Sequence, residues 1–315
     1  MNFHSGLGAE LSSLPLGGAI RWYYVRPRFR AFLENLKITE YQTNDGETKH
    51  RGVVSCLNRG YWNSSDDSMN RILIGSWGKY TWVRPPRDVD ILFVLPLEVY
   101  WRFEQRSGNR QSQLLQEVKS WLQATYPQTD IRGDGQVVVV PFNSCKVEVA
   151  PAFPYRGGGY LVCDTHEGGR YKWVHPEAEI AALDGADTAL NGNVRKLNRI
   201  LKQWQRHCNV PIKSFQIEAL VMEVLSRLIY GGNDEFWFDW LVRDALGHMI
   251  SRANGRFTMP ITGEVIPLGD AWLSKASSAH GRAFRACELE YGNWETLAGD
   301  EWQKIFGTMI PTRIG

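Results

Sequence analysis

Two aspartates in alternate positions and a third acid in a later segment are the residues of this chain whose types and spacing could do chemistry. The stretch from Gly75 to Asp90 reads GSWGKYTWVRPPRDVD, and Glu148 lies in KVEVAP. In an extended strand the side chains alternate between the two faces, so Asp88 and Asp90 project the same way. Converging carboxylates repel each other unless a strong cation offsets their charge. Because carboxylate oxygens suit Mg²⁺, with Mn²⁺ as an alternative, the pattern predicts metal-dependent transfer of a nucleotidyl group.

The Gly-Ser pair before these acids has a task of its own in such a site. It follows RILI, a short apolar run that is typical of a buried strand. Gly75 would let the backbone turn sharply, so that amides and the Ser76 hydroxyl could face phosphate oxygens. In a two-metal displacement the ions lie about 3.5 to 4 Å apart, and Asp88 and Asp90 would serve both of them. Glu148 would complete the ion that activates the attacking hydroxyl.

Each of these pieces also has a plainer interpretation. A DxD pair is more often part of a solvated edge strand, a Gly-Ser pair is more often an ordinary turn, and Glu148 alone would be an exposed strand residue. The context favours chemistry, because DVDILFVL and QVVVV are typical of central strands and KVEVA places Lys146 and Glu148 on one face. A core sheet is not expected to carry three acids without a use for them.

The order of a Gly-Ser turn, DVD and a third acid in VEVAPAF resembles the polymerase-beta type nucleotidyltransferase superfamily. Four later segments resemble the bacterial cGAS/DncV-like nucleotidyltransferases: WVHP (173–176), LKQW (201–204), PIKSFQIE (211–218) and KIFG (304–307). The resemblance runs from FLENLKITEYQ (32–42) to the end of the chain. Glu148 stands where many relatives have aspartate, a mild departure because either carboxylate can bind Mg²⁺.

The fold that this resemblance implies is α+β. A polymerase-beta-like nucleotidyltransferase lobe with a mixed sheet and an N-terminal helix would span residues 1–170. A mainly helical lobe over residues 171–315 would complete the nucleotide cleft.

The resemblance also assigns roles in the second half of the chain. Lys202 and Ser214 match family residues that contact the triphosphate, and Phe215 falls where an aromatic ring often stacks on a base. The residues alone say less: the helical stripe of RKLNRILKQW leaves Lys202 off the buried face, where a lysine is usually just solvated, and Phe215 reads as a core residue. The apolar stripe consists of Leu197, Ile200, Leu201 and Trp204.

The activity implied by the resemblance is the joining of nucleoside triphosphates, with purines favoured, into a cyclic di- or trinucleotide. In the family such products are second messengers that switch on an effector protein in bacterial antiphage defence (CBASS). Some relatives are also joined through their last residue to other molecules by ubiquitin-like conjugation enzymes. Gly315 allows that hypothesis here, although a glycine that happens to be last is the simpler interpretation.

Three other functions remain open. A related enzyme could make a linear product or modify a small molecule, but LKQW and PIKSF speak against it. An inactive nucleotide-binding regulator is disfavoured because all three acids are present. An interaction protein with a structural ion would leave the Gly-Ser turn unexplained.

Composition limits the partners and the compartment. The chain has 36 basic and 34 acidic residues and a net charge of +2, so no clear nucleic-acid surface is expected. Five scattered cysteines without a CxxC pair favour a reduced, cytoplasmic protein. Zinc at Cys163 with His166, or at His207 with Cys208, is the weaker interpretation of those pairs. The best apolar run, ILFVLPLEVYW, contains Pro96 and Glu98, so no membrane span is expected.

The periodicity predicts where helices and strands lie. Strands are expected within 71–95 and 136–150 and in a short segment through Trp173, and IRWYYVRPRFR near the N-terminus is expected to dock on the body or bind a partner. Trp77 could pack in the core or shape the donor pocket. Helices are expected over 32–57, 109–125, 177–183, 194–207, 214–230, 234–250 and 270–291.

Overall fold

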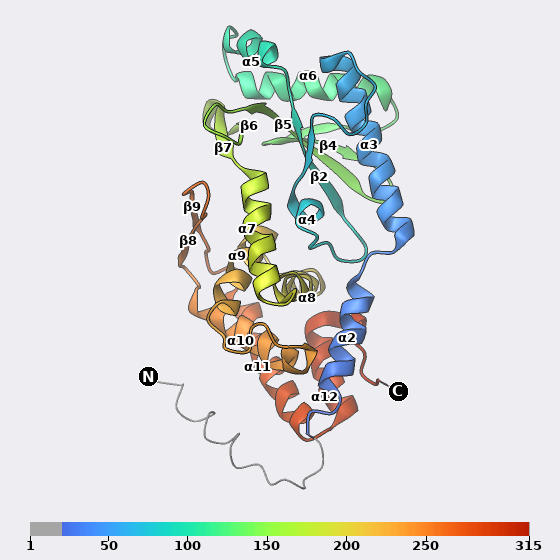
Figure 1. Ribbon diagram of the computed structural model, residues 1–315, viewed down its shortest axis with the longest axis vertical. Coiled ribbons are helices and arrows are strands. Elements are labelled where there is room, and N and C mark those ends of the chain that lie inside the picture. The colour runs from blue at the N-terminus through green and yellow to red at the C-terminus, as the bar shows by residue number, and fades with distance from the viewer. Residues whose placement is uncertain (1–20, 315) are drawn as a thin grey trace.

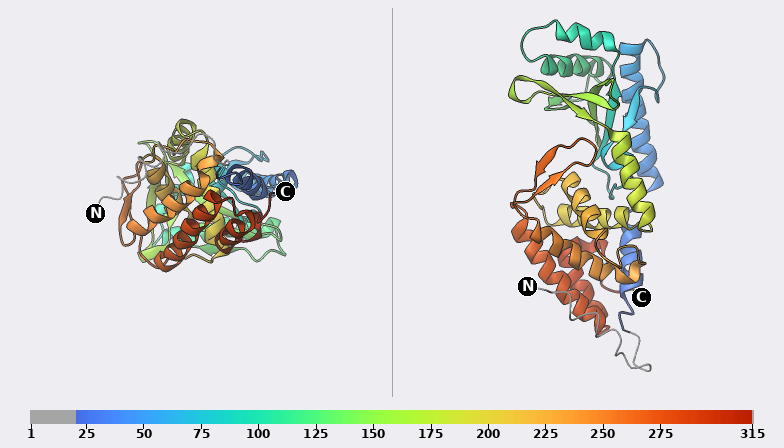
Figure 2. Two further views of the ribbon diagram at one scale, coloured as in Figure 1. Left: turned by 90° about the horizontal axis from the view of Figure 1, so that it is seen from below. Right: turned by 60° about the vertical axis from the view of Figure 1, so that its left-hand side comes forward.

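The computed structural model describes residues 21–314, which form two lobes stacked along the long axis of the molecule (Figure 1). The upper lobe in that view contains a mixed sheet with helices packed on it, and the lower lobe is helical. Figure 2 shows the same division from the side. The expected α+β fold with a helical second lobe is confirmed.

The strand order brings the two acid-bearing strands together. Within residues 21–314 the main sheet has seven strands, in the order β1-β2-β5-β4-β3 with β6 and β7 extending from β5. β2 (Asp88–Val94) and β5 (Lys146–Pro154) pair in parallel, whereas the other pairings are antiparallel. The remaining strands are β1 (Arg71–Leu73), β3 (Arg132–Asp134), β4 (Val137–Pro141), β6 (Tyr160–Asp164) and β7 (Arg170–Val174).

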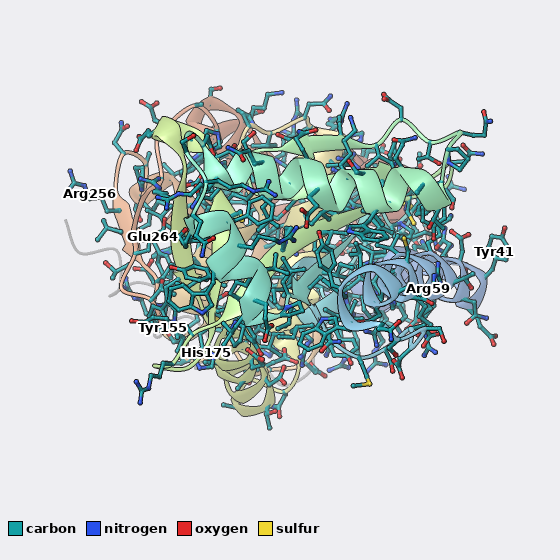
Figure 3. The ribbon with its side chains drawn as sticks, turned by 90° about the horizontal axis from the view of Figure 1, so that it is seen from above. Tyr41, Arg59, Tyr155, His175, Arg256 and Glu264 are labelled. Atoms are coloured by element: carbon teal, nitrogen blue, oxygen red, sulfur yellow. The ribbon has the colours of Figure 1, made fainter. Side chains whose placement is uncertain are left out.

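Three helices bury the face of the sheet that lies opposite the acids. They are α3 (Glu40–Trp62), α5 (Leu97–Glu104) and α6 (Arg110–Thr125). Seen from above, α5 and α6 lie across this lobe, and exposed side chains such as Tyr41 project outward (Figure 3). Val89, Ile91 and Phe93 of β2 are fully buried in this core. The alternation of a strand therefore turns Asp88 and Asp90 the other way.

The helical lobe has an apolar core of its own, rich in aromatic rings. Trp204, Trp272 and Trp302 are fully buried there, where their large rings fill the core. A hairpin and three 3-10 turns complete the fold: β8 (Arg256–Thr258), β9 (Val265–Pro267), η1 (His166–Gly168), η2 (Glu235–Trp237) and η3 (Gly307–Met309). The helices of this lobe are α2 (Val25–Leu36), α7 (Pro176–Ala189), α8 (Asn193–His207), α9 (Ser214–Leu225), α10 (Phe238–Ser251), α11 (Leu273–Tyr291) and α12 (Glu295–Phe306).

The single helix expected over 32–57 is wrong. α2 ends at Leu36 and α3 begins at Glu40, because Thr39 and Gln42 form a capping box that starts a new helix. α2 packs on the core of the helical lobe, whereas α3 packs on the sheet. The division of the chain near residue 170 stays a prediction.

Several other boundaries differ from the expectation. The helix expected to reach residue 230 ends at Leu225, and the one expected over 177–183 extends from Pro176 to Ala189. α5, α12 and the β8–β9 hairpin were not predicted. The helix over 109–125 is confirmed, with Asn109 as its cap, and α8 buries its predicted apolar stripe. No helix among residues 21–314 is long and apolar enough to cross a bilayer.

The aromatic and basic segment near the N-terminus docks on the body through Arg28. Its guanidinium is fully buried and pairs with Glu290 at 2.7 Å. It also donates to the carbonyl oxygens of Glu295, Pro311 and Thr312 at 2.6 to 2.9 Å. One buried side chain therefore ties α2 to α11, α12 and the C-terminal tail.

Replacing Arg28 with Met should lower the free energy of unfolding by about 3–5 kcal/mol, because it leaves the Glu290 carboxylate buried without its partner. The control is Arg26→Met, since Arg26 pairs with Asp234 at 2.6 Å but both side chains are nearly half exposed. That variant should lose no more than about 1 kcal/mol. Urea denaturation measures both values, and equal losses would contradict the prediction.

Candidate active site

The parallel register of β2 and β5 puts the three acids side by side. Asp90 lies opposite Glu148, and Asp88 lies opposite Lys146. Gly75 lies against this group, because a Cβ on it would be 2.1 Å from the Asp90 carboxylate. Only glycine fits there, and its φ of +56° is the left-handed conformation that glycine adopts readily.

The three carboxylates repel one another in a partly buried environment, which disfavours the ionised form of Asp90. Burial, and then the charges of Asp88 and Glu148, raise the pKa of Asp90 to about 8. The Lys146 ammonium offsets part of the charge, since it contacts Glu148 and lies 3.9 Å from an Asp88 oxygen.

The three acids supply carboxylate oxygens with excess negative charge, a donor type that suits Mg²⁺ or Mn²⁺. Within residues 21–314, however, no three His, Cys, Asp or Glu side chains are arranged to hold a metal ion, and this includes the pairs Cys163 with His166 and His207 with Cys208. At the acids, Glu148 contacts the Lys146 ammonium and also faces Asp90. A metal that uses all three acids would compete with Lys146 for Glu148.

The Gly-Ser turn is a short helix, α4 (Gly75–Gly78), rather than the simple turn expected. The amides of Gly78 and Lys79 return to the carbonyls of Ile74 and Gly75, which closes one helical turn. Ser76 faces the cavity beside the acids, whereas Trp77 is only 3% exposed and packs against Gly46 of α3. Trp77 is therefore a core residue.

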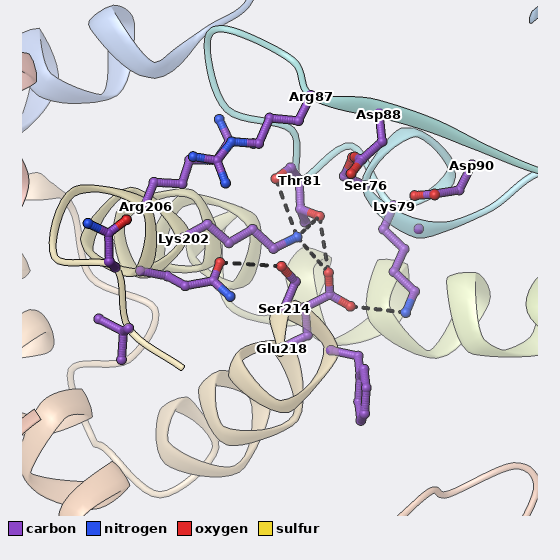
Figure 4. Close-up of a pocket in the computed structure, with 15 residues that line it drawn as sticks. Ser76, Lys79, Thr81, Arg87, Asp88, Asp90, Lys202, Arg206, Ser214 and Glu218 are labelled. Carbon is purple, nitrogen blue, oxygen red and sulfur yellow. Dashed lines mark hydrogen bonds and ion pairs between the residues drawn. The ribbon is translucent and has the colours of Figure 1, made fainter. Parts of the chain in front are cut away.

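A cavity of about 510 Å³ lies between the lobes, next to Asp88 and Asp90 (Figure 4). Glu148 does not line it. The lining residues are Gly75, Ser76, Lys79, Thr81, Arg87, Asp88, Asp90, Lys202, Gln205, Arg206, Asn209, Val210, Ser214, Phe215 and Glu218.

Opposite the acids, one buried carboxylate holds two ammonium groups. Glu218 of α9 accepts from Lys202 at 2.7 Å and from Lys79 at 3.0 Å (Figure 4). Thr81 completes the group, 2.7 Å from the Lys202 ammonium and 3.2 Å from Glu218. The prediction that Lys202 lies off the buried face is wrong: it is 5% exposed, because its ion pair lets the helix bury this side too.

Ser214 and Phe215 open helix α9 at the edge of the cavity. The hydroxyl of Ser214 lies 3.4 Å from the side-chain oxygen of Gln205. Phe215 is 37% exposed, so it is available to a ligand and is not the core residue that its apolar character suggested. The structure thus brings Gly75, Ser76, Lys202, Ser214 and Phe215 to one cavity with Asp88 and Asp90.

Several lining residues were missed from the sequence. Glu218 lies four positions after Ser214 and Arg206 lies four after Lys202, so each shares a helical face with a predicted residue. That spacing could have identified both. Thr81 and Asn209 lie in loops and give no such signal.

Comparison with known proteins identifies the family. A family model described as the Second Messenger Oligonucleotide or Dinucleotide Synthetase domain matches residues 24–186, just over half of the chain. The chain belongs to this family. The match contains the three acids and the Gly-Ser pair, and it ends before Lys202, Ser214 and Phe215. A comparison with curated protein sequences found no match.

Solved structures of such synthetases share the fold. CdnC of E. coli MS115-1, in its complex with HORMA-deltaN, is 16% identical with a TM-score of 0.64, over 90% of this chain and 98% of CdnC. Vibrio cholerae DncV, in complex with the linear intermediate 5′ pppA(3′,5′)pG, is 12% identical with a TM-score of 0.63, over 92% of this chain and 87% of DncV. The CdnE c-di-GMP synthase of Capnocytophaga granulosa is 13% identical with a TM-score of 0.60, over 83% of this chain and 84% of CdnE. The resemblance to cGAS/DncV-like nucleotidyltransferases is confirmed.

In this synthetase-family member, Glu218 should stabilise the fold in a pH-dependent way. Burial alone would raise its pKa, but the ammonium groups of Lys202 and Lys79 outweigh burial and lower the pKa from 4.5 to about 2. A lowered pKa stabilises the folded state where the unfolded carboxyl is ionised. The contribution, about 3 kcal/mol, is therefore complete above pH 4.5 and is lost as the pH falls toward 2.

Urea denaturation of Glu218→Gln against the unchanged protein tests this. The difference in free energy of unfolding should be constant between pH 5 and 7 and should shrink below about pH 4.5. Glu34→Gln serves as the control, because the pair of Glu34 with Lys37 is more than half exposed. A Glu218→Gln difference that does not change with pH would contradict the assignment.

Proposed function

We propose that this protein is a metal-dependent nucleotidyltransferase that joins nucleoside triphosphates into a cyclic di- or trinucleotide and releases pyrophosphate. The observation that carries the proposal is the pair Asp88 and Asp90, with Glu148 beside them, facing two ammonium groups across one cavity. A ligand that fits must bring a cation to one wall and anions to the other. A nucleoside triphosphate with its divalent metal has both.

Each side chain has a role in this proposal. Asp88, Asp90 and Glu148 would hold Mg²⁺ or Mn²⁺, which when bound activates the attacking ribose hydroxyl and stabilises the leaving pyrophosphate. Positioning and charge neutralisation supply most of the rate in such transfers. The residues that would bind the triphosphate are Gly75 and Ser76 with Lys79, Lys202 and Ser214. Phe215 would stack on a base, and purines are favoured.

The structural relatives support a cyclic product. CdnE is a c-di-GMP synthase, CdnC has been solved with ATP, and DncV with a linear dinucleotide intermediate. By extension, the product here would be a second messenger that acts on an effector in cytoplasmic antiphage defence (CBASS). Conjugation at Gly315 stays a hypothesis, because that residue lies outside the described part of the chain.

Incubation with four labelled triphosphates and Mg²⁺, then phosphatase and mass spectrometry, tests the product. A phosphatase-resistant cyclic nucleotide is expected, and Asp88→Asn or Asp90→Asn should reduce its formation by on the order of 10⁴-fold. Both variants should remain folded, because each removes one of three carboxylate charges that repel one another. A linear product would favour a terminal transferase. Nucleotide binding without turnover would favour a regulator. Full activity in both Asn variants would exclude the assignment of these acids.

Phe215→Ala should weaken binding of the stacked nucleotide by about 1–3 kcal/mol, which is seen as a raised KM. Phe215→Tyr keeps a ring of the same size and should retain the KM of the unchanged protein. Because Phe215 is partly exposed, neither change should alter the melting temperature much. Steady-state kinetics at saturating metal measure the effect, and an unchanged KM in Phe215→Ala would show that the ring does not stack on a base.

A further inference from the structure

Lys146 occupies an unusual position among the acids. It lies two residues before Glu148 on β5, so both side chains project from the same face of the strand. In the parallel register it is the direct neighbour of Asp88 on β2. Its ammonium contacts Glu148 and lies 3.9 Å from Asp88, so one side chain bridges acids on both strands.

This bridge involves the oxygens that a metal would need. Asp88 and Asp90 line the cavity, whereas Glu148 does not, and the Glu148 carboxylate is held by Lys146. A divalent ion bound by all three acids would face the Lys146 ammonium across the same carboxylates. Two cations that close repel each other. The metal and the Lys146 ammonium therefore compete for the charge of Glu148, although Lys146 contacts only one of its two carboxylate oxygens.

The side chain of Lys146 is able to leave. It is 40% exposed, and a lysine has a flexible four-carbon stem that carries a compact charge. Glu148 in turn faces Asp90 across the strand pair and already lies within hydrogen-bonding reach of that carboxyl. Departure of the ammonium therefore frees a carboxylate that is already beside Asp90.

We propose that Lys146 is a positioning residue that acts as the resident counter-ion of the acid cluster. It holds Glu148 in the metal-free protein and releases it when the metal binds. Metal binding is then an exchange of an ammonium group for a divalent ion, and Lys146 lowers the apparent affinity for the metal. This inference rests on the proposed function, because it takes the three acids as the metal site.

Mn²⁺ binding to the nucleotide-free protein tests the exchange without relying on activity. Electron paramagnetic resonance measures free Mn²⁺ and gives the dissociation constant. Lys146→Met keeps the length of the stem and removes the charge, so Mn²⁺ should bind about 5-fold tighter or more. Lys146→Arg keeps the charge and should bind Mn²⁺ as the unchanged protein does.

Lys172→Met is the matched control. Lys172 also lies on a strand and forms an ion pair with Glu264 at 2.7 Å, but that pair links β7 to the β8–β9 hairpin. Its removal should leave the dissociation constant for Mn²⁺ unchanged. As a second measurement, the melting temperature without metal should fall in Lys146→Met, and saturating Mn²⁺ should raise it by more than in the unchanged protein.

The outcomes separate this inference from the proposed function. If Glu148→Gln weakens Mn²⁺ binding but Lys146→Met leaves it unchanged or weakens it, the counter-ion role is wrong and the metal site stands. If the unchanged protein binds no Mn²⁺, both proposals fail. Tighter Mn²⁺ binding in Lys146→Met, with unchanged binding in Lys146→Arg and Lys172→Met, supports the exchange.

Discussion

Repulsion among three carboxylates on two adjacent strands is the constraint on which the rest of the structure depends. The pairing of β2 with β5 keeps Asp88, Asp90 and Glu148 together. The residues between them, Val89 and Val147 among others, are fully buried on the opposite face of the sheet. Burial of those side chains supplies the free energy that holds the strands in register despite the repulsion. The cost of concentrating charge is thus met by the apolar core directly behind it.

Positive side chains lie across the cavity from these carboxylates. Glu218 gathers the ammonium groups of Lys79 and Lys202, one from each lobe, and Glu179 lies 3.8 Å from Lys79 on the other side. Arg206 of α8 adds a further link, since it donates to the carbonyl oxygens of Val83 and Pro85 in the loop before β2. The cavity therefore has Asp88 and Asp90 on the sheet and basic side chains from both lobes around them.

The sequence predicts the parts of this arrangement that depend on local periodicity. Alternation in DVD and KVEV placed the acids on one face, and the stripe of α8 was buried as expected. It did not predict the burial of Lys202, because that depends on Glu218 from another helix meeting it in space. The break between α2 and α3 was missed although Thr39 and Gln42 give a local capping signal. The position of the Lys146 ammonium between two strands follows from register, which periodicity alone does not give.

The two apolar cores are separate clusters, and the cavity between the lobes is lined mostly by polar side chains. A junction of this kind suits a charged ligand. Opening an apolar interface would expose hydrophobic surface, whereas each ion pair broken at a polar junction can be replaced by one with the ligand. In the proposed function, the phosphates of a nucleotide would take the place of Glu218 on the lysines, and a metal would take the place of Lys146 on Glu148. Under that proposal the charges would select the class of ligand, and the choice of base would be left to neutral contacts such as the exposed ring of Phe215.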